Sequence, residues 1–155
     1  MSYHPAGHES PRTRQLHIAA NPETSSVVLR KLATLTEDRS ILIYLAENRS
    51  TPADTLSTLS RHESPEVRTA VADNPSCPAE ILDYLVKDIS ADLRFAMAEN
   101  HCLAEELLYD LAMDENPWIA DRAERTLARL AEEAAKVNEL ELDLSQTDSS
   151  TTCRR

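Results

Sequence analysis

Two arginines repeat at a fixed interval and are the side chains best suited to bind an anionic group. Arg68 and Arg94 lie 26 positions apart, and each precedes an acidic residue, Asp73 or Glu99, by five positions. A planar guanidinium offers a fork of donors that matches a carboxylate or a phosphate. Two interpretations are open: a basic stripe that binds such a ligand, or ion pairs with carboxylates of the adjacent repeat that set how the repeats stack.

The histidines and cysteines form no catalytic or metal-binding pattern. His62 and His101 fall in polar turns of different repeats and have no recognisable nucleophile partner. Cys77 and Cys102 fall in successive turns, one position out of register, and two thiols without matched histidines are a poor zinc site. We therefore predict no catalytic residue, no metal site and no cofactor.

The composition disfavours nucleotide-dependent enzymes and nucleic-acid binders. The only glycine in the 155 residues is Gly7, so the chain has no glycine-rich phosphate loop and no dinucleotide-binding fingerprint. With 16 basic and 27 acidic residues, the net charge is -11 and the pI is about 4.8. Such a chain repels a phosphate backbone, which makes nucleic acid an unfavourable partner.

Cysteine usage and hydropathy predict a cytoplasmic protein that makes no membrane contact. The three cysteines form no CxxC pair, and their odd number argues against a disulfide framework and for a reducing compartment. The longest apolar run, Ile41 to Ala46, is far shorter than a membrane span. The opening stretch MSYHPAGHESPRTR lacks the apolar region of a signal peptide.

A repeat of 26 residues supplies the elements that position these side chains. The stretch VRTAVADNPSCPAEILDYLVKDISAD, residues 67–92, aligns with LRFAMAENHCLAEELLYDLAMDENPW, residues 93–118, without a gap. The period predicts a solenoid, an all-α chain of about four to five helical repeats. Asparagine recurs at one repeat position in four copies, as Asn21, Asn48, Asn74 and Asn100.

Each repeat divides into a first helix, a polar turn and a second helix. Val67, Ala70 and Val71 share the inward face of a first helix, and Ile81 and Leu85 that of a second. The helices are too short to be stable alone, so stacking must stabilise them. We expect the four turn asparagines to end the first helices in the left-handed conformation, and to form a ladder of hydrogen bonds that links successive turns.

The repeat resembles that of the leucine-rich repeat variant family. The resemblance covers roughly residues 15–125 and is strongest at VRTAVADNPSCPAEILDYL and LRFAMAENHCLAEELLYDLA, whereas Leu42 stands where the later copies have arginine. It implies a right-handed superhelix of alternating α- and 3₁₀-helices without strands, and no single activity. Some members carry an iron-sulfur cluster on an N-terminal cysteine-rich segment. No cysteine precedes Cys77 here, so we expect no cluster.

The ends of the chain differ from the repeats. Residues 1–14 lack apolar periodicity and predict a flexible arm, in which His4 and His8 lack a third metal ligand. Residues 15–137 form the predicted repeat region. Residues 138–155, ELELDLSQTDSSTTCRR after Asn138, predict a disordered acidic and Ser/Thr-rich tail.

From about residue 118 the repeat region is predicted to end in one longer helix. Its apolar residues recur at spacings of three and four, as in a heptad seam that could pair two chains into a weak homodimer. The alternative, which we prefer, is that this helix caps the open end of the solenoid. Alanines and Glu141 interrupt the seam, and a monomer then results.

Departures from the consensus indicate where a partner binds. Phe95 lies beside Arg94 and off the core stripe, and Trp118 lies at the start of the terminal helix, where it could instead cover the junction. Large aromatic side chains at such positions anchor protein interfaces. The candidate partner-binding residues lie on the first helices and at the start of the terminal helix, and they are Arg68, Thr69, Asp73, Arg94, Phe95, Glu99 and Trp118.

These features favour a non-enzymatic scaffold or adaptor that binds another protein along one face, and the acidity favours a partner with a basic surface. Two other functions stay open. One is a helical-repeat enzyme with a site on the concave face, which needs converging polar groups with shifted pKa values. The other is an acidic mimic of nucleic acid, which needs its negative charges along a single face.

Overall fold

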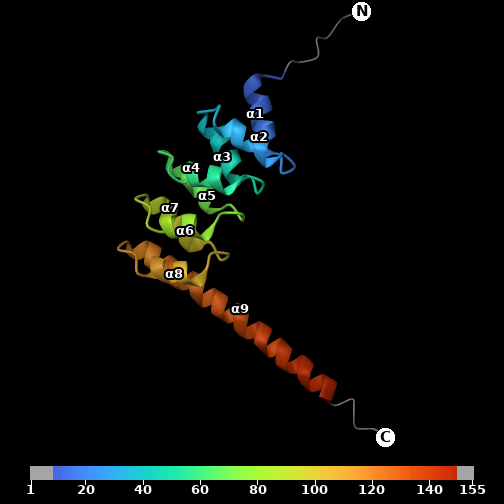
Figure 1. Ribbon diagram of the computed structural model, residues 1–155. Helices are drawn as coiled ribbons and strands as arrows, with labels where there is room; N and C mark the ends of the chain where they lie inside the picture. The colour runs from blue at the N-terminus through green and yellow to red at the C-terminus, as the bar shows by residue number, and fades with distance from the viewer. Residues whose placement is uncertain (1–8, 150–155) are drawn as a thin grey trace, which may run out of the picture. The chain divides into compact units, whose positions relative to one another are not determined.

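The computed structural model describes residues 9–149, which form nine α-helices and no strand. The helices are α1 (Pro11–Ala20), α2 (Ser26–Ala33), α3 (Arg39–Glu47), α4 (Ala53–Leu59), α5 (Pro65–Ala72), α6 (Ala79–Leu85), α7 (Ala91–Glu99), α8 (Glu105–Ala112) and α9 (Pro117–Ser149). The chain is therefore all-α over this range (Figure 1). None of these helices combines the length and the low charge that crossing a membrane requires.

The 3₁₀-helices that the resemblance implied do not occur among the described residues. The second helices α4 and α6 contain α-type hydrogen bonds from residue i to residue i−4, whereas the turns that follow them, and the ends of α2 and α8, close with bonds from residue i to residue i−3. In α4 the N–H of Ser60 donates to the carbonyl of Leu56 at 2.8 Å, and in α6 the N–H of Val86 donates to that of Leu82 at 2.9 Å.

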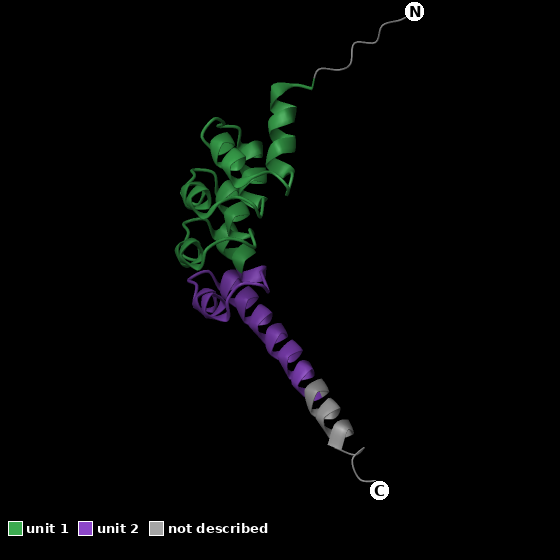
Figure 2. Ribbon diagram, turned by 45° about the vertical axis from the view of Figure 1, so that its right-hand side comes forward, with its two compact units in different colours: residues 1–97 green, residues 98–155 purple. Residues whose placement is uncertain are grey.

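The chain divides into two compact units, residues 1–97 and residues 98–155 (Figure 2). In the first unit the first helices pack in sequence, α1 against α3 and α3 against α5, and the second helices α2, α4 and α6 contact the first helices that precede them. Leucines close the spaces between the two sets of helices. Leu29, Leu45, Leu56 and Leu85 have no exposed surface.

The second unit consists of α8 packed against the beginning of α9. Ile119 and Ala123 of α9, together with Leu108 of α8, are at most 1% exposed. Beyond this contact every side chain from Ala131 to Glu139 is exposed. Among the residues of α9 up to Glu139, those in the first turns therefore contribute to the core of this unit.

Both ends of the helical region extend further than the sequence suggested. The first helix begins at Pro11, inside the arm expected over residues 1–14, because the side chain of Ser10 accepts the N–H of Thr13 and a proline in the first turn favours a helix start. Helix α9 continues to Ser149, into the tail expected over residues 138–155. No glycine or proline follows Pro117, so no strong helix breaker interrupts α9 at residue 138. Residues 1–8 and 150–155 lie outside the described residues.

Turn asparagines link successive repeats of the first unit through their side-chain amides. Asn48 donates to the carbonyls of Ala19 at 2.7 Å and Asn21 at 2.9 Å, and Asn74 donates to those of Ala46 at 2.5 Å and Asn48 at 3.0 Å. Both amides are buried. Each asparagine therefore donates to two carbonyls at the end of the preceding first helix and the start of its turn.

In the second unit a threonine makes the corresponding hydrogen bond. Thr126 lies 26 positions after Asn100, inside α9, and its hydroxyl donates to the carbonyl of Ala98 at 2.7 Å. Asn74 reaches Ala46 across the same interval in sequence. A side-chain donor thus persists at this repeat position even where the polar turn has been replaced by continuous helix.

The asparagines do not adopt the left-handed conformation that we expected. Asn21 and Asn48 are extended, with φ of -76° and -71°, and no non-glycine residue among those described has a positive φ. The side-chain oxygen turns the chain instead by accepting the N–H two residues later. Asn48 accepts in this way from Ser50 at 2.9 Å, and Asn74 from Ser76 at 2.7 Å.

Candidate partner-binding face

A groove of about 370 Å³ opens on the side of α3 and α5 where the sequence placed the partner-binding face. Its lining residues are Ile43, Glu47, Pro65, Glu66, Thr69, Ala70, Asp73, Ser90 and Asp92. Four of these side chains are carboxylic acids, and none carries a positive charge. The groove therefore presents a concave acidic surface within the first unit.

The turn asparagines position two of the four acids. Glu47 and Asp73 directly precede Asn48 and Asn74, whose buried amides hold successive turns together. Because the two turns are linked, the acids repeat on the same side of the first helices. Glu66 and Asp92 show the same interval of 26 residues, each in the first turn of its helix, α5 and α7.

The four acids differ in their surroundings. Burial by the groove walls raises the pKa of the Asp73 carboxyl. Glu66 accepts a hydrogen bond from the hydroxyl of Ser64 and lies 3.4 Å from the guanidinium of Arg39, and the pKa of its carboxyl is lowered, chiefly by the hydrogen bond from Ser64. A cation bound beside Asp73 would favour the ionised form of its carboxyl and so oppose the effect of burial.

Thr69, Asp73 and Phe95 of the sequence-predicted face belong to the first unit. Thr69 and Asp73 line the groove, and the hydroxyl of Thr69 donates to the carbonyl of Pro65 at 3.0 Å. Phe95 lies on α7, which also carries the groove residue Asp92, and its side chain is 37% exposed. An aromatic ring that is partly covered and partly exposed is typical of an interface anchor.

The two arginines form internal contacts, but Arg68 pairs with a carboxylate of its own repeat rather than of the adjacent one, and it is only 8% exposed. Its Nε and Nη2 each donate to Asp88 at 2.7 Å, and its Nη1 donates to the carbonyls of His62 at 2.7 Å and Glu63 at 3.0 Å. Arg94 repeats part of this pattern, because its Nη1 donates to the carbonyl of Asp88 at 2.7 Å. We therefore do not include Arg68 in the partner surface proposed below.

Glu99 and Trp118 belong to the second unit. Glu99 is exposed and lies 3.0 Å from the guanidinium of Arg122 on α9. Trp118 is 76% exposed, so it covers little of the junction where α9 begins. A large aromatic side chain exposed to solvent at the start of a helix is typical of a contact with a partner protein rather than of a cover for the junction.

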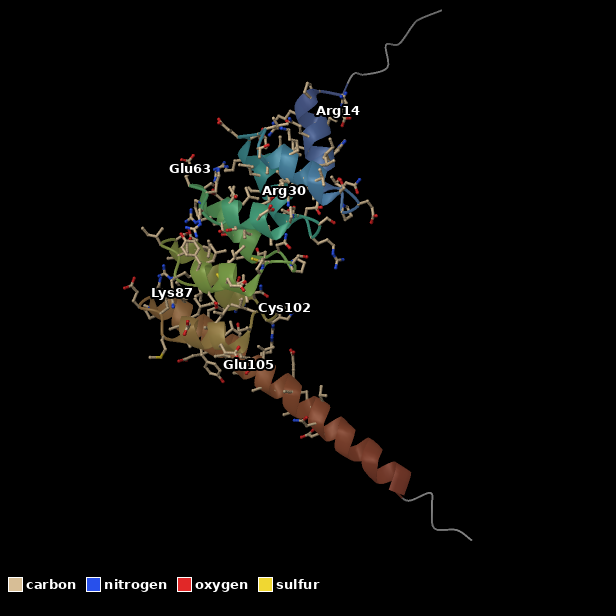
Figure 3. The ribbon with its side chains drawn as sticks, in the orientation of Figure 1. Arg14, Arg30, Glu63, Lys87, Cys102 and Glu105 are labelled. Carbon is tan, nitrogen blue, oxygen red and sulfur yellow. The ribbon has the colours of Figure 1, made fainter. Side chains whose placement is uncertain are left out.

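A second set of side chains, at one repeat position, shapes the turns that follow the second helices, and the sequence alone did not reveal it. Thr36, His62, Asp88 and Asp114 recur at 26-residue intervals. Each side chain accepts the N–H two residues later, at distances of 2.8 to 3.1 Å. His62 therefore has a structural partner, the N–H of Ser64. Figure 3 labels Glu63 and Lys87, which lie on the turns that follow α4 and α6.

Sequence patterns did not predict that Glu47, Glu66 and Asp92 belong to the acidic groove. A signal was available, because Glu47 lies one period before Asp73, and Glu66 one period before Asp92. In sequence these two pairs look like ordinary surface charge. Only the side-by-side packing of α3 and α5 brings them to one groove.

Among the residues that the structure describes, no group of three or more His, Cys, Asp or Glu side chains could hold a metal ion. Cys77 is half-buried and Cys102 exposed, and both are free thiols. Burial raises the pKa of the Cys77 thiol to about 11. Comparison with protein-family models, curated proteins and solved structures finds no match for this chain.

Proposed function

We propose that this protein is a non-enzymatic scaffold that binds a basic segment of a partner protein along its first helices. The acidic groove beside α3 and α5 carries this proposal, because Glu47, Glu66, Asp73 and Asp92 meet there without a lysine, arginine or histidine in the lining. Opposite charge across such a surface speeds association and makes binding sensitive to salt.

The proposed architecture is a right-handed α-solenoid of about four to five repeats, similar to the leucine-rich repeat variant family. Its supports are the recurrence of 26 residues and the amides of Asn48 and Asn74, which bond the preceding turn in the same way. In this architecture Phe95 extends the acidic groove with an apolar anchor, and Trp118 and Glu99 provide further contacts. We propose a cytoplasmic protein that is a monomer or a weak homodimer through α9.

A mimic of nucleic acid is a weaker candidate because of where the acids lie. Acidic side chains occupy the second helices as well as the first, for example Asp54 of α4 and Glu80 and Asp83 of α6. A decoy for a nucleic-acid-binding protein needs its charges along one face. An enzyme with a site on the concave face remains an alternative.

The proposal is tested by affinity purification of the tagged protein at low and moderate salt, with three matched baits. These are the wild type, the charge-neutral variant Glu47→Gln/Asp73→Asn, and Phe95→Ala. We expect one stoichiometric partner on the wild type, lost as salt rises, and strongly reduced on both variants. Circular dichroism spectra must match among the baits. Equal recovery of the same partner on all three baits would refute binding at this face.

A further inference from the structure

Helices α3 and α5 differ at the position that Arg68 occupies in α5. Their N-caps are Asp38 and Ser64, and Leu42 follows the first cap at the same interval at which Arg68 follows the second. Arg68 fills its place with a guanidinium that donates to the carbonyls of the turn before its own helix, those of His62 and Glu63.

Both members of the Arg68–Asp88 ion pair are replaced one repeat earlier. Leu42 stands for Arg68, and His62 stands for Asp88. The carbonyls that correspond to those of His62 and Glu63 belong to Thr36 and Glu37. Leu42 has no donor to offer them.

A groove of about 1010 Å³ opens at this place in the first unit. Thr36, Glu37, Leu42, His62 and Glu63 are among its lining residues, and Leu42 is 4% exposed at its floor. In the next repeat the equivalent space contains the guanidinium of Arg68, bonded on both edges. The groove thus lies at the repeat position of the Arg68 site and has the same backbone carbonyl acceptors, but a buried leucine replaces the arginine.

The charges in the groove favour a cation. Glu37 and Glu63 are exposed and lie on successive turns at the same repeat position. Of the two arginines in the lining, Arg39 pairs with Glu66 at 3.4 Å, and the guanidinium of Arg61 lies over the ring of Tyr84, 5.3 Å from its centre. The carboxylates of Glu37 and Glu63 supply the negative charge that Asp88 supplies in the next repeat.

We propose that this groove binds an arginine side chain of the partner protein, in the way that the fold binds Arg68 internally. The guanidinium donates to the carbonyls of Thr36 and Glu37 and pairs with the carboxylates of Glu37 and Glu63. Arginine fits better than lysine, since only a planar fork reaches a carbonyl pair and a carboxylate together. This deepens the proposed function and rests on it for the source of the arginine.

The test is a titration of the ¹⁵N-labelled full-length protein with N-acetyl-arginine amide, followed by backbone amide shifts. We expect saturable shifts of Glu37, Asp38 and Glu63 with a Kd in the millimolar range, and at least fivefold weaker binding of N-acetyl-lysine amide. Absence of shifts at these amides, or equal affinity for the two ligands, would overturn the proposal.

The blocking variant Leu42→Arg/His62→Asp installs the internal ion pair in this repeat and should abolish the arginine shifts without loss of helical content. Unchanged binding by this variant would also refute the site. Glu37→Gln/Glu63→Gln changes only exposed side chains and should weaken arginine binding at least threefold. This second variant keeps the test decisive if the blocking variant does not fold. Unchanged arginine binding by Glu37→Gln/Glu63→Gln would also refute the site.

The two grooves separate this inference from the proposed function. Glu47 and Asp73 do not line the groove at Leu42. Retention of a salt-sensitive partner by Leu42→Arg/His62→Asp, together with its loss from Glu47→Gln/Asp73→Asn, would uphold the scaffold and reject the arginine site. Saturable amide shifts with N-acetyl-arginine amide, in a protein that recruits no partner, would uphold the arginine site and reject the scaffold.

Discussion

The side-chain amide of Asn74 donates to the main-chain carbonyl of Asn48, the residue at the same position of the preceding repeat, at 3.0 Å. Asn48 in turn donates to the carbonyl of Asn21 at 2.9 Å. Each link joins a side chain to the backbone of the turn before it, so a single residue type both shapes its own turn and fixes the distance to its neighbour. The free energy of unfolding of the first unit should therefore depend strongly on the side-chain amides of Asn48 and Asn74.

Asn74→Ala should lower the free energy of unfolding by about 3 kcal/mol, because it removes the side-chain partners of the buried carbonyl of Ala46 and of the N–H of Ser76, and one of the two hydrogen bonds to the carbonyl of Asn48. Urea unfolding monitored by circular dichroism measures the change. Asn21→Ala is the matched control, since Asn21 is exposed and its oxygen only accepts the N–H of Glu23. A thermal midpoint of Asn74→Ala equal to that of the wild type would contradict the role of the ladder.

Arg68 and Asp88 should be replaceable together by leucine and histidine, the residues at the same positions of the preceding repeat. Asp88→Asn leaves a buried guanidinium without its carboxylate and should cost about 3 kcal/mol. The double variant Arg68→Leu/Asp88→His copies the native Leu42 and His62 and should be clearly more stable than Asp88→Asn. A double-mutant cycle by urea unfolding measures the coupling. Additive losses would show that the two residues act independently.

Stability should fall in acid because of the same pair. Burial alone raises the pKa of the Asp88 carboxyl, but the bond from Arg68, the N–H of Ser90 and the charges of Arg68 and Arg94 outweigh it and hold the pKa below its usual value. Because the pKa of this carboxyl is lower in the folded than in the unfolded protein, the carboxylate stabilises the fold fully at pH values above its unfolded-state pKa of about 3.9. This stabilisation is lost as the pH falls through the folded-state pKa. When unfolding is measured from pH 6 to pH 2, the urea concentration at the midpoint should decrease once the pH is below about 4. The decrease should be smaller in Arg68→Leu/Asp88→His.

Truncation after Leu130 should leave the thermal midpoint of the second unit unchanged, because the side chains of residues 131–139 are exposed while Ile119 and Ala123 are buried. Ile119→Ala should lower the midpoint by several degrees. Sedimentation velocity of the full chain and the truncated chain then tests the homodimer. A concentration-dependent dimer that vanishes on truncation assigns self-association to the exposed part of α9, and identical monomers refute it.

Cys77 should react slowly with thiol reagents. Since burial raises the pKa of its thiol from 9.0 to about 11, roughly a hundredfold less thiolate is present near pH 8 than for an ordinary cysteine. Iodoacetamide labelling of the Cys153→Ser variant, followed by peptide mass spectrometry, should modify Cys102 well before Cys77. In urea the two rates should converge. Equal rates in the folded protein would be the contrary result.

The sequence was sufficient for the features that depend on residues close together along the chain. Apolar spacing predicted first and second helices, the interval of 26 predicted which residues are equivalent, and the recurrence of asparagine indicated a side-chain role in the turns. These features follow from helical periodicity and local hydrogen bonding, which act over a few residues. The same local rules failed at Asn48, where the side chain turns the chain without a left-handed residue.

Contacts between residues far apart in the sequence were decided only by the tertiary structure. Arg68 pairs with Asp88, twenty residues later, rather than with the nearer Asp73, because helix packing brings that turn to the guanidinium and leaves Asp73 in the groove. The sequence marks Leu42 as an exception to the arginine pattern, yet the groove beside it appears only when the turns at Glu37 and Glu63 are stacked. Local pattern thus defines the helices, and their packing determines which charges are buried and which can meet a partner.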